Sequence, residues 1–147
     1  MTGLYIVALA LALALGFGLY RKAVDGRVRP VRATAGTDIL GLGTELGSTA
    51  SFVQFSSAVC APCRATSKVL DEVSSGAVGV AHIEIDAENR LDLVEQLGIT
   101  RTPTVLVLDR DGVVRGRMVG APRRADVLQA LAGLTDVAPG AVTSAAA

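Results

Sequence analysis

The stretch Val59-Cys60-Ala61-Pro62-Cys63-Arg64 contains both cysteines of this 147-residue chain. A strand-like run over residues 51–55 precedes it, and a helix-like run over residues 64–74 follows it. Cys60 is therefore expected at a helix N-terminus, where free N–H groups and the helix dipole favour a thiolate. Pro62 suits the first turn of that helix, because its missing N–H would have no partner there. A Cys-x-x-Cys pair between a strand and a helix indicates dithiol redox chemistry.

Two other roles of the cysteines have less support. A disulfide that closes so short a loop does little to constrain the unfolded chain, so a purely structural role brings little stability. A structural zinc site needs four ligands, and the chain offers two cysteines and a single histidine. No nucleotide-binding or metal-binding motif is visible, and thiol–disulfide exchange requires no organic cofactor.

The N-terminal segment is strongly apolar. Residues 4–20 carry no charge and would span roughly 25 Å as a helix, against about 30 Å for the hydrocarbon core of a bilayer. Tyrosines bracket the stretch, and two basic residues follow it. We expect a transmembrane anchor over residues 1–20. A cleavable signal peptide is the alternative, but residues 1–8 lack the basic residues with which such peptides begin.

Charge divides the chain into a basic and an acidic part. Residues 1–32 hold five basic groups and one acidic group, whereas residues 33–147 hold nine basic and thirteen acidic groups. By the positive-inside rule, we expect a single-pass membrane protein whose domain lies on the cytoplasmic face and whose basic flank contacts membrane lipid. An acidic domain in a chain with 3% aromatic residues argues against nucleic-acid binding.

The residues beyond the cysteine motif alternate between strand and helix patterns. Strands are predicted over residues 51–55, 78–86, 104–108 and 113–119, and helices over residues 64–74, 89–97 and 122–133. The near-continuous apolar run 104–108 indicates a central strand, and Asp109-Arg110-Asp111-Gly112 predicts a hairpin turn after it. This order predicts an α/β fold in which helices cover a sheet on both sides.

The predicted elements also divide the chain into segments. After the anchor, residues 21–49 are expected to form a basic juxtamembrane segment and linker. Residues 50–133 are expected to form the folded domain, and residues 134–147 a flexible tail.

Two further segments accompany the cysteine motif. Gly98-Ile99-Thr100-Arg101-Thr102-Pro103-Thr104 precedes the central strand, and Val119-Gly120-Ala121 precedes the last helix. Together with Cys60-Ala61-Pro62-Cys63, they make residues 50–133 resemble the thioredoxin superfamily. The resemblance implies a thioredoxin-like fold with a mixed central sheet. The apolar run 4–20 adds an N-terminal transmembrane helix before this domain. The resemblance also implies a thiol–disulfide oxidoreductase that acts on protein disulfides.

The resemblance implies roles for individual residues. Cys60 would attack a substrate disulfide, Cys63 would resolve the mixed disulfide, and Pro103 would follow a cis peptide bond opposite them. The backbone of Thr102 would pair with an extended substrate, and Gly120 would let that substrate approach. The predicted substrate-binding residues are therefore Thr102, Gly120, Ala61 and Pro62.

Three positions depart from the family pattern. Val59 stands where thioredoxins carry a tryptophan, Gln54 where they carry a buried aspartate, and His82 where they often carry a lysine. The buried Asp–Lys pair is thus expected to be a Gln–His pair. Because a glutamine cannot take up a proton from Cys63, His82 is the candidate for proton transfer, with solvent as the alternative acceptor. The alternative for His82 is a partly buried, hydrogen-bonded strand residue.

We expect a membrane-tethered protein-disulfide reductase that depends on an upstream reductant or membrane redox partner. Three other functions stay open from the sequence. They are a dedicated electron relay to a membrane partner, a thiol oxidase or isomerase on the outer face, and a non-catalytic binding module.

Overall fold

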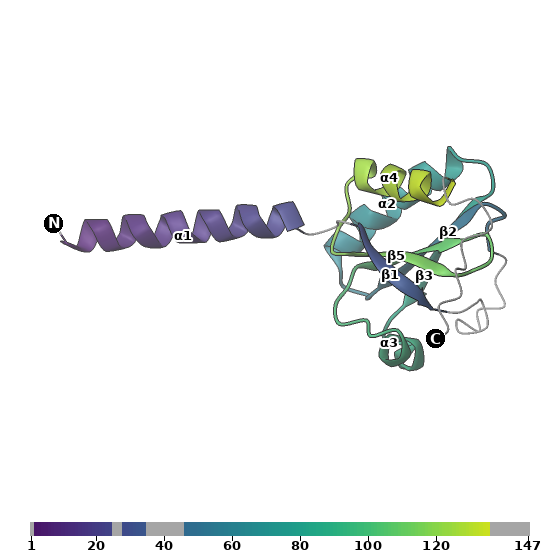
Figure 1. Ribbon diagram of the computed structural model, residues 1–147. Coiled ribbons are helices and arrows are strands. Elements are labelled where there is room, and N and C mark those ends of the chain that lie inside the picture. Colours follow the sequence, from purple (N-terminus) through teal and green to yellow (C-terminus); the bar gives the residue numbers. More distant parts are fainter. Residues whose placement is uncertain (1, 25–27, 35–45, 136–147) are drawn as a thin grey trace, which may run out of the picture.

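A computed structural model describes residues 2–24, 28–34 and 46–135, and within them the chain forms four helices and five strands (Figure 1). Most of the predicted tail and much of the predicted linker lie outside these described residues. The elements in chain order are α1 (Thr2–Val24), β1 (Val28–Thr34), β2 (Ala50–Ser56), α2 (Ala61–Ser75), β3 (Val80–Asp86), α3 (Leu91–Gln96), β4 (Thr104–Asp109), β5 (Val114–Val119) and α4 (Arg124–Thr135).

The strands form one mixed sheet in the order β1-β5-β4-β2-β3. β2 and β3 are parallel and joined through α2, whereas the other neighbouring pairs are antiparallel. β2 therefore lies inside the sheet, with a hydrogen-bonded strand on each edge. The predicted α/β fold with a mixed sheet and flanking helices is confirmed.

Two apolar cores lie on opposite faces of this sheet, because successive side chains of a strand point to opposite sides. α2 and α4 lie on one side of the sheet and α3 on the other (Figure 1). Phe52 of β2 packs with side chains of α2 and α4, whereas Val53 and Phe55 pack with Leu93 of α3. The first core consists of Phe52, Leu70, Val73, Val105, Val107, Met118, Val127 and Ala130. The second consists of Val53, Phe55, Ile85, Leu93, Ile99, Leu106, Leu108 and Val114.

β1 was not expected from the sequence, which predicted a linker over residues 21–49. Its backbone pairs antiparallel with β5, with Val28 opposite Met118 and Pro30 opposite Gly116. Among the described strands β1 pairs with β5 alone, so it is an edge strand, in which a proline that cannot donate a backbone hydrogen bond is tolerated. The strand covers the outer edge of β5, whose N–H and C=O groups would otherwise lack strand partners.

The predicted hairpin connects β4 and β5. The carboxylate of Asp109 accepts backbone hydrogen bonds from Asp111 and Val113 at 3.0 and 2.9 Å, and Arg115 Nε donates to it over 2.6 Å. The pKa of Asp109 lies below its ordinary value: partial burial raises it, but the bonds from Arg115 and the backbone outweigh that effect. Gly112 completes the turn at φ +71°, a conformation that favours glycine.

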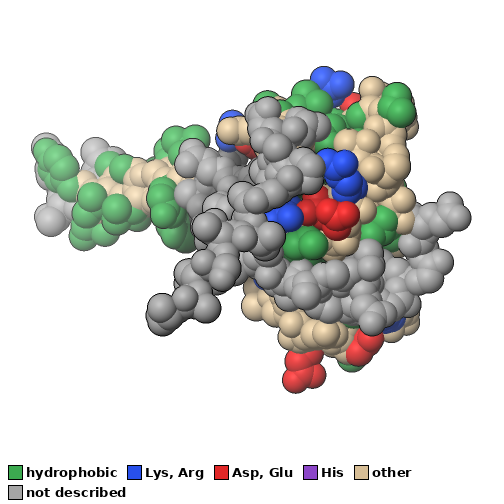
Figure 2. Space-filling view, turned by 45° about the vertical axis from the view of Figure 1, so that its right-hand side comes forward, with side chains coloured by type: hydrophobic (Ala, Val, Ile, Leu, Met, Phe, Trp, Pro, Cys, Tyr) green, Lys and Arg blue, Asp and Glu red, His purple; other side chains and the backbone are tan. Residues whose placement is uncertain are grey.

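The large apolar side chains of α1 are exposed from Tyr5 to Tyr20 (Figure 2). Across residues 2–24, 28–34 and 46–135, no helix combines the length and the apolarity needed to cross a membrane. The predicted transmembrane anchor and single-pass membrane location, with the domain on the cytoplasmic face, are therefore wrong. The uncharged run 4–20 covers only about 25 Å as a helix, short of the roughly 30 Å hydrocarbon core.

Candidate active site

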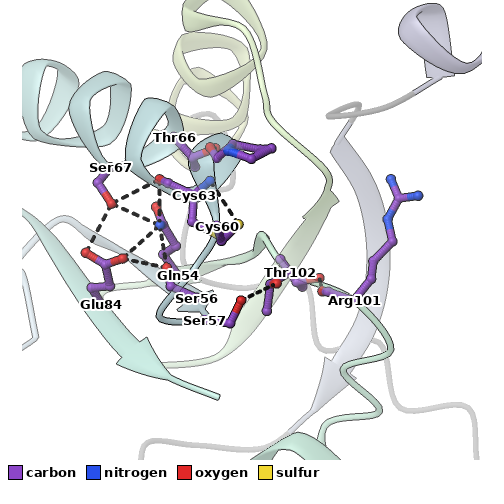
Figure 3. The surroundings of a disulfide bond; sticks show 12 residues. Gln54, Ser56, Ser57, Cys60, Cys63, Thr66, Ser67, Glu84, Arg101 and Thr102 are labelled. Atoms are coloured by element: carbon purple, nitrogen blue, oxygen red, sulfur yellow. Dashed lines mark hydrogen bonds between the residues drawn. A yellow bond between two sulfur atoms is a disulfide. The ribbon is translucent and has the colours of Figure 1, made fainter. Parts of the chain in front are cut away.

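The two cysteines form a disulfide at the N-terminus of α2 (Figure 3). Their Cα atoms are 5.2 Å apart. Cys60 is the N-cap residue with extended backbone, and Cys63 lies in the first turn of the helix. The backbone N–H of Cys63 donates to the Cys60 Sγ over 3.1 Å. The helix start therefore directs an amide at the sulfur of Cys60, which favours negative charge on that sulfur once the disulfide is reduced.

The two cysteines differ in their surroundings. Cys60 retains 8% of its surface and Cys63 only 2%, so an incoming sulfur atom reaches Cys60 more readily. Val59, Ala61 and Pro62 around Cys60 are all exposed. The predicted attacking cysteine is thus the more accessible of the two and has exposed neighbours in the chain.

The loop between α3 and β4 lies beside the disulfide. Its Thr102–Pro103 peptide bond is cis, as the sequence predicted, and Pro103 is buried. The hydroxyl oxygens of Thr102 and Ser57 are 3.2 Å apart, which ties the loop to the segment between β2 and Cys60. In Figure 3, Thr102 lies on the side of the disulfide away from Glu84.

Gly120 follows β5 and is hydrogen-bonded to the loop between α3 and β4. Its backbone N–H donates to the carbonyl of Pro103 over 2.8 Å. Its φ of +87° lies in a region that residues with a side chain rarely adopt. The backbone conformation of Gly120 therefore helps to set where the cis-proline loop lies.

We expect Gly120→Ala to destabilise the protein by about 1–2 kcal/mol, because a Cβ is strained at positive φ. Urea unfolding should show a lower midpoint at an unchanged slope. Gly76→Ala is the matched control: Gly76 has φ −87°, and an added Cβ would make only ordinary contacts of 3.4 Å or more. Equal midpoints for the two variants would contradict a conformational requirement at Gly120.

A polar cluster lies under Cys63, on the face of the sheet that α2 covers. Gln54 is fully buried, and its Nε2 lies 3.1 Å from the carbonyl oxygen of Cys63 and 3.1 Å from Glu84 Oε1. Ser56 and Ser67 both donate to the Glu84 carboxylate, Ser67 over 3.0 Å (Figure 3). In the described part of the chain, no three His, Cys, Asp or Glu residues are placed to hold a metal ion.

His82 lies elsewhere on the same face. Its Nδ1 is 2.7 Å from Asp71 Oδ1, and its side chain is 7% exposed. Asp71 is eight residues beyond Cys63, about two helical turns further along α2. The expected Gln54–His82 pair is therefore wrong, because Gln54 contacts Glu84 and His82 contacts Asp71. The structure does not bring His82 to Cys63, and its placement fits the alternative of a partly buried, hydrogen-bonded strand residue.

Sequence reasoning missed Glu84, Ser56 and Ser67. A signal for Glu84 was present, because Ile83 and Ile85 alternate with it and leave it on the other face of β3. Parallel register places Glu84 opposite Gln54, but a sequence alone does not state that register. Ser67 is four residues beyond Cys63, hence on the same side of α2.

The comparison with protein families covers this whole site. The family profile described as a thioredoxin-like domain matches residues 45–135, more than half of the chain. The chain belongs to the thioredoxin-like family. The match includes the Cys60–Cys63 disulfide, the cis-proline loop and Gly120. With its Cys-x-x-Cys disulfide at the start of α2, this thioredoxin-like protein is a thiol–disulfide oxidoreductase.

Solved thioredoxins share the fold at low sequence identity. Chloroplastic thioredoxin z is 21% identical with a TM-score of 0.57, over 69% of this chain and 91% of that one. A mutant thioredoxin from Halobacterium salinarum is 17% identical with a TM-score of 0.57, over 76% of this chain and 95% of that one. Thioredoxin f from spinach chloroplast is 23% identical with a TM-score of 0.53, over 61% of this chain and 74% of that one. At such identities the likeness establishes the fold of this thioredoxin-like domain.

Proposed function

We propose that this protein is a protein-disulfide reductase in which Cys60 is the nucleophile and Cys63 the resolving cysteine. The Cys60 thiolate attacks one sulfur of a substrate disulfide and expels the other as a thiolate, which forms a mixed disulfide. The Cys63 thiolate then attacks the Cys60 sulfur and releases the reduced substrate. The substrate gains two electrons, and the Cys60–Cys63 pair becomes a disulfide again.

The hydrogen bond from the Cys63 amide to the Cys60 sulfur carries this proposal. A thiol attacks a disulfide only as its thiolate, and amide donors at a helix N-terminus stabilise that anion. The exposed residues around Cys60 leave room for a protein substrate. An upstream reductant must return two electrons and two protons to the pair after each turnover.

The proposed substrate surface surrounds Cys60. Thr102 lies before the cis-proline with its hydroxyl against Ser57, and its backbone is proposed to pair with an extended substrate segment. Gly120 leaves space beside that segment, and the exposed Ala61 and Pro62 provide the apolar contact. The catalytic unit proposed here is residues 50–133, with Pro103 as the residue that shapes the loop opposite the cysteines.

Insulin reduction tests this function on the full chain. With dithiothreitol as the electron source, we expect the protein to accelerate insulin precipitation well above the rate of dithiothreitol alone. The control is the same protein after reduction and alkylation of both cysteines, which should return the rate to that of dithiothreitol. A rate equal to the control at all protein concentrations would exclude the proposed reductase activity.

A further inference from the structure

The orientation of the Gln54 side-chain amide is fixed by its neighbours. The carbonyl oxygen of Cys63 and the carboxylate of Glu84 can only accept hydrogen bonds. Both lie 3.1 Å from Nε2 of Gln54, and the hydroxyls of Ser56 and Ser67 lie 2.7 and 3.0 Å from it. The NH₂ group must therefore face these four partners, and the amide oxygen must point away from them.

That amide oxygen has no partner in the disulfide state. Gln54 is 0% exposed, and its Oε1 is buried without a hydrogen bond to any described residue. A buried acceptor left without a donor costs about 1–3 kcal/mol, so a protein gains stability when a donor arrives. Figure 3 shows Gln54 joined by a hydrogen bond to the backbone carbonyl of Cys63. The sulfur of Cys63 carries no hydrogen while the disulfide is intact.

Reduction changes this situation. An external dithiol breaks the S–S bond, is itself oxidised to a disulfide, and leaves two thiols in place of the Cys60–Cys63 bond once two protons are bound. The thiol of Cys63 is then a hydrogen-bond donor in a nearly closed site, since Cys63 is 2% exposed. Reduction therefore introduces a new donor on Cys63, the residue whose carbonyl oxygen the Gln54 amide already contacts.

We propose that the Gln54 amide oxygen accepts a hydrogen bond from the Cys63 thiol in the reduced protein and thereby stabilises the dithiol state. Glu84 is a positioning residue, because its carboxylate holds the NH₂ group and so leaves the amide oxygen available to a new donor. Gln54 cannot remove the proton, so it holds Cys63 as a thiol until a stronger acceptor arrives. This inference rests on the proposed function only in requiring that the disulfide be reducible.

The dithiol–disulfide equilibrium tests the proposal. Gln54→Met keeps the size of the side chain and removes the acceptor, so the full chain equilibrated with oxidised and reduced dithiothreitol should be more oxidised. The equilibrium constant for reduction should fall about fivefold, the effect of one lost hydrogen bond, equivalent to a potential about 20 mV lower. Ser67→Ala is the matched control: it removes the bonds of Ser67 to Cys63, Glu84 and Gln54 Nε2, but it keeps the Gln54 amide oxygen and the Nε2 contacts to Cys63, Ser56 and Glu84.

Two results would overturn the proposal. One is an equilibrium constant for Gln54→Met within twofold of wild type. The other is an equal fall in the Ser67→Ala variant, which would assign the effect to the cluster as a whole. Insulin assays are independent of this readout, so a shifted equilibrium without insulin reduction would refute the reductase and keep the role of Gln54.

A structure of the reduced wild-type protein gives a second test that does not require the Gln54→Met variant to fold. We expect the Cys63 sulfur within hydrogen-bond distance of Gln54 Oε1, with the Nε2 contacts to Cys63 and Glu84 retained. An amide oxygen bound to a water molecule, or an amide turned over, would contradict the proposal.

Discussion

Replacing Cys60 with serine is expected to lower the rate of insulin reduction by at least about a hundredfold, to the rate of dithiothreitol alone. A serine hydroxyl remains protonated at neutral pH, so the amide of Cys63 would then face a neutral oxygen that cannot attack a disulfide. The measurement is the initial rate of insulin precipitation at equal protein concentration, with folding checked by circular dichroism.

Cys63→Ser distinguishes the nucleophile from the resolving cysteine. This variant keeps Cys60 but cannot complete the second step, so the mixed disulfide with the substrate should accumulate and survive until a reductant is added. Non-reducing electrophoresis detects the adduct. If Cys60→Ser forms the adduct and Cys63→Ser does not, the two roles are reversed.

Leu70→Ala is expected to cost about 2–5 kcal/mol of unfolding free energy. Leu70 is 0% exposed and joins α2 to the core that contains Phe52 and Val127, so its truncation leaves a cavity under the helix that begins at the disulfide. Domains of this size are stable by about 5–15 kcal/mol, so this loss is a large fraction of the total. Urea unfolding of the oxidised protein measures it.

Val78→Ala provides the control for this loss. Val78 is 97% exposed, so its truncation creates no cavity and should change the unfolding free energy by less than about 0.5 kcal/mol. Similar losses in the two variants would show that the packing under α2 does not hold the domain together.

The parts of the fold that follow from local patterns were predicted from the sequence. The hairpin turn at Asp109 and Gly112 requires only residues near it in the chain. The cis bond before Pro103 followed from the family resemblance, and the redox pairing of the cysteines followed from their spacing at a strand-to-helix junction, because both motifs are short and contiguous. The predicted ends of the elements were less accurate. β3 begins at Val80 rather than at residue 78, and α3 covers Leu91–Gln96 rather than residues 89–97.

The parts that depend on pairing between distant segments were not predicted. β1 contains a proline and no clear alternation, and it is a strand because β5 offers it an edge. Glu84 reaches the site because β3 pairs with β2 in a particular register. His82 was matched to a family position, but its partner Asp71 is set by how α2 packs on β3. Tertiary contacts, rather than local propensity, decide these three placements.

β2 also determines the order in which the domain can open. It is buried along its whole length and hydrogen-bonded to β3 and β4, whereas β1 pairs with β5 alone among the strands that the structure describes. Edge strands separate in low-energy local openings, but a central strand is released only when the whole domain unfolds. The disulfide comes soon after the end of β2, so the redox centre is joined to the last part of the sheet to come apart. Fluctuations that detach β1 from β5 can therefore occur without disturbing the cysteines.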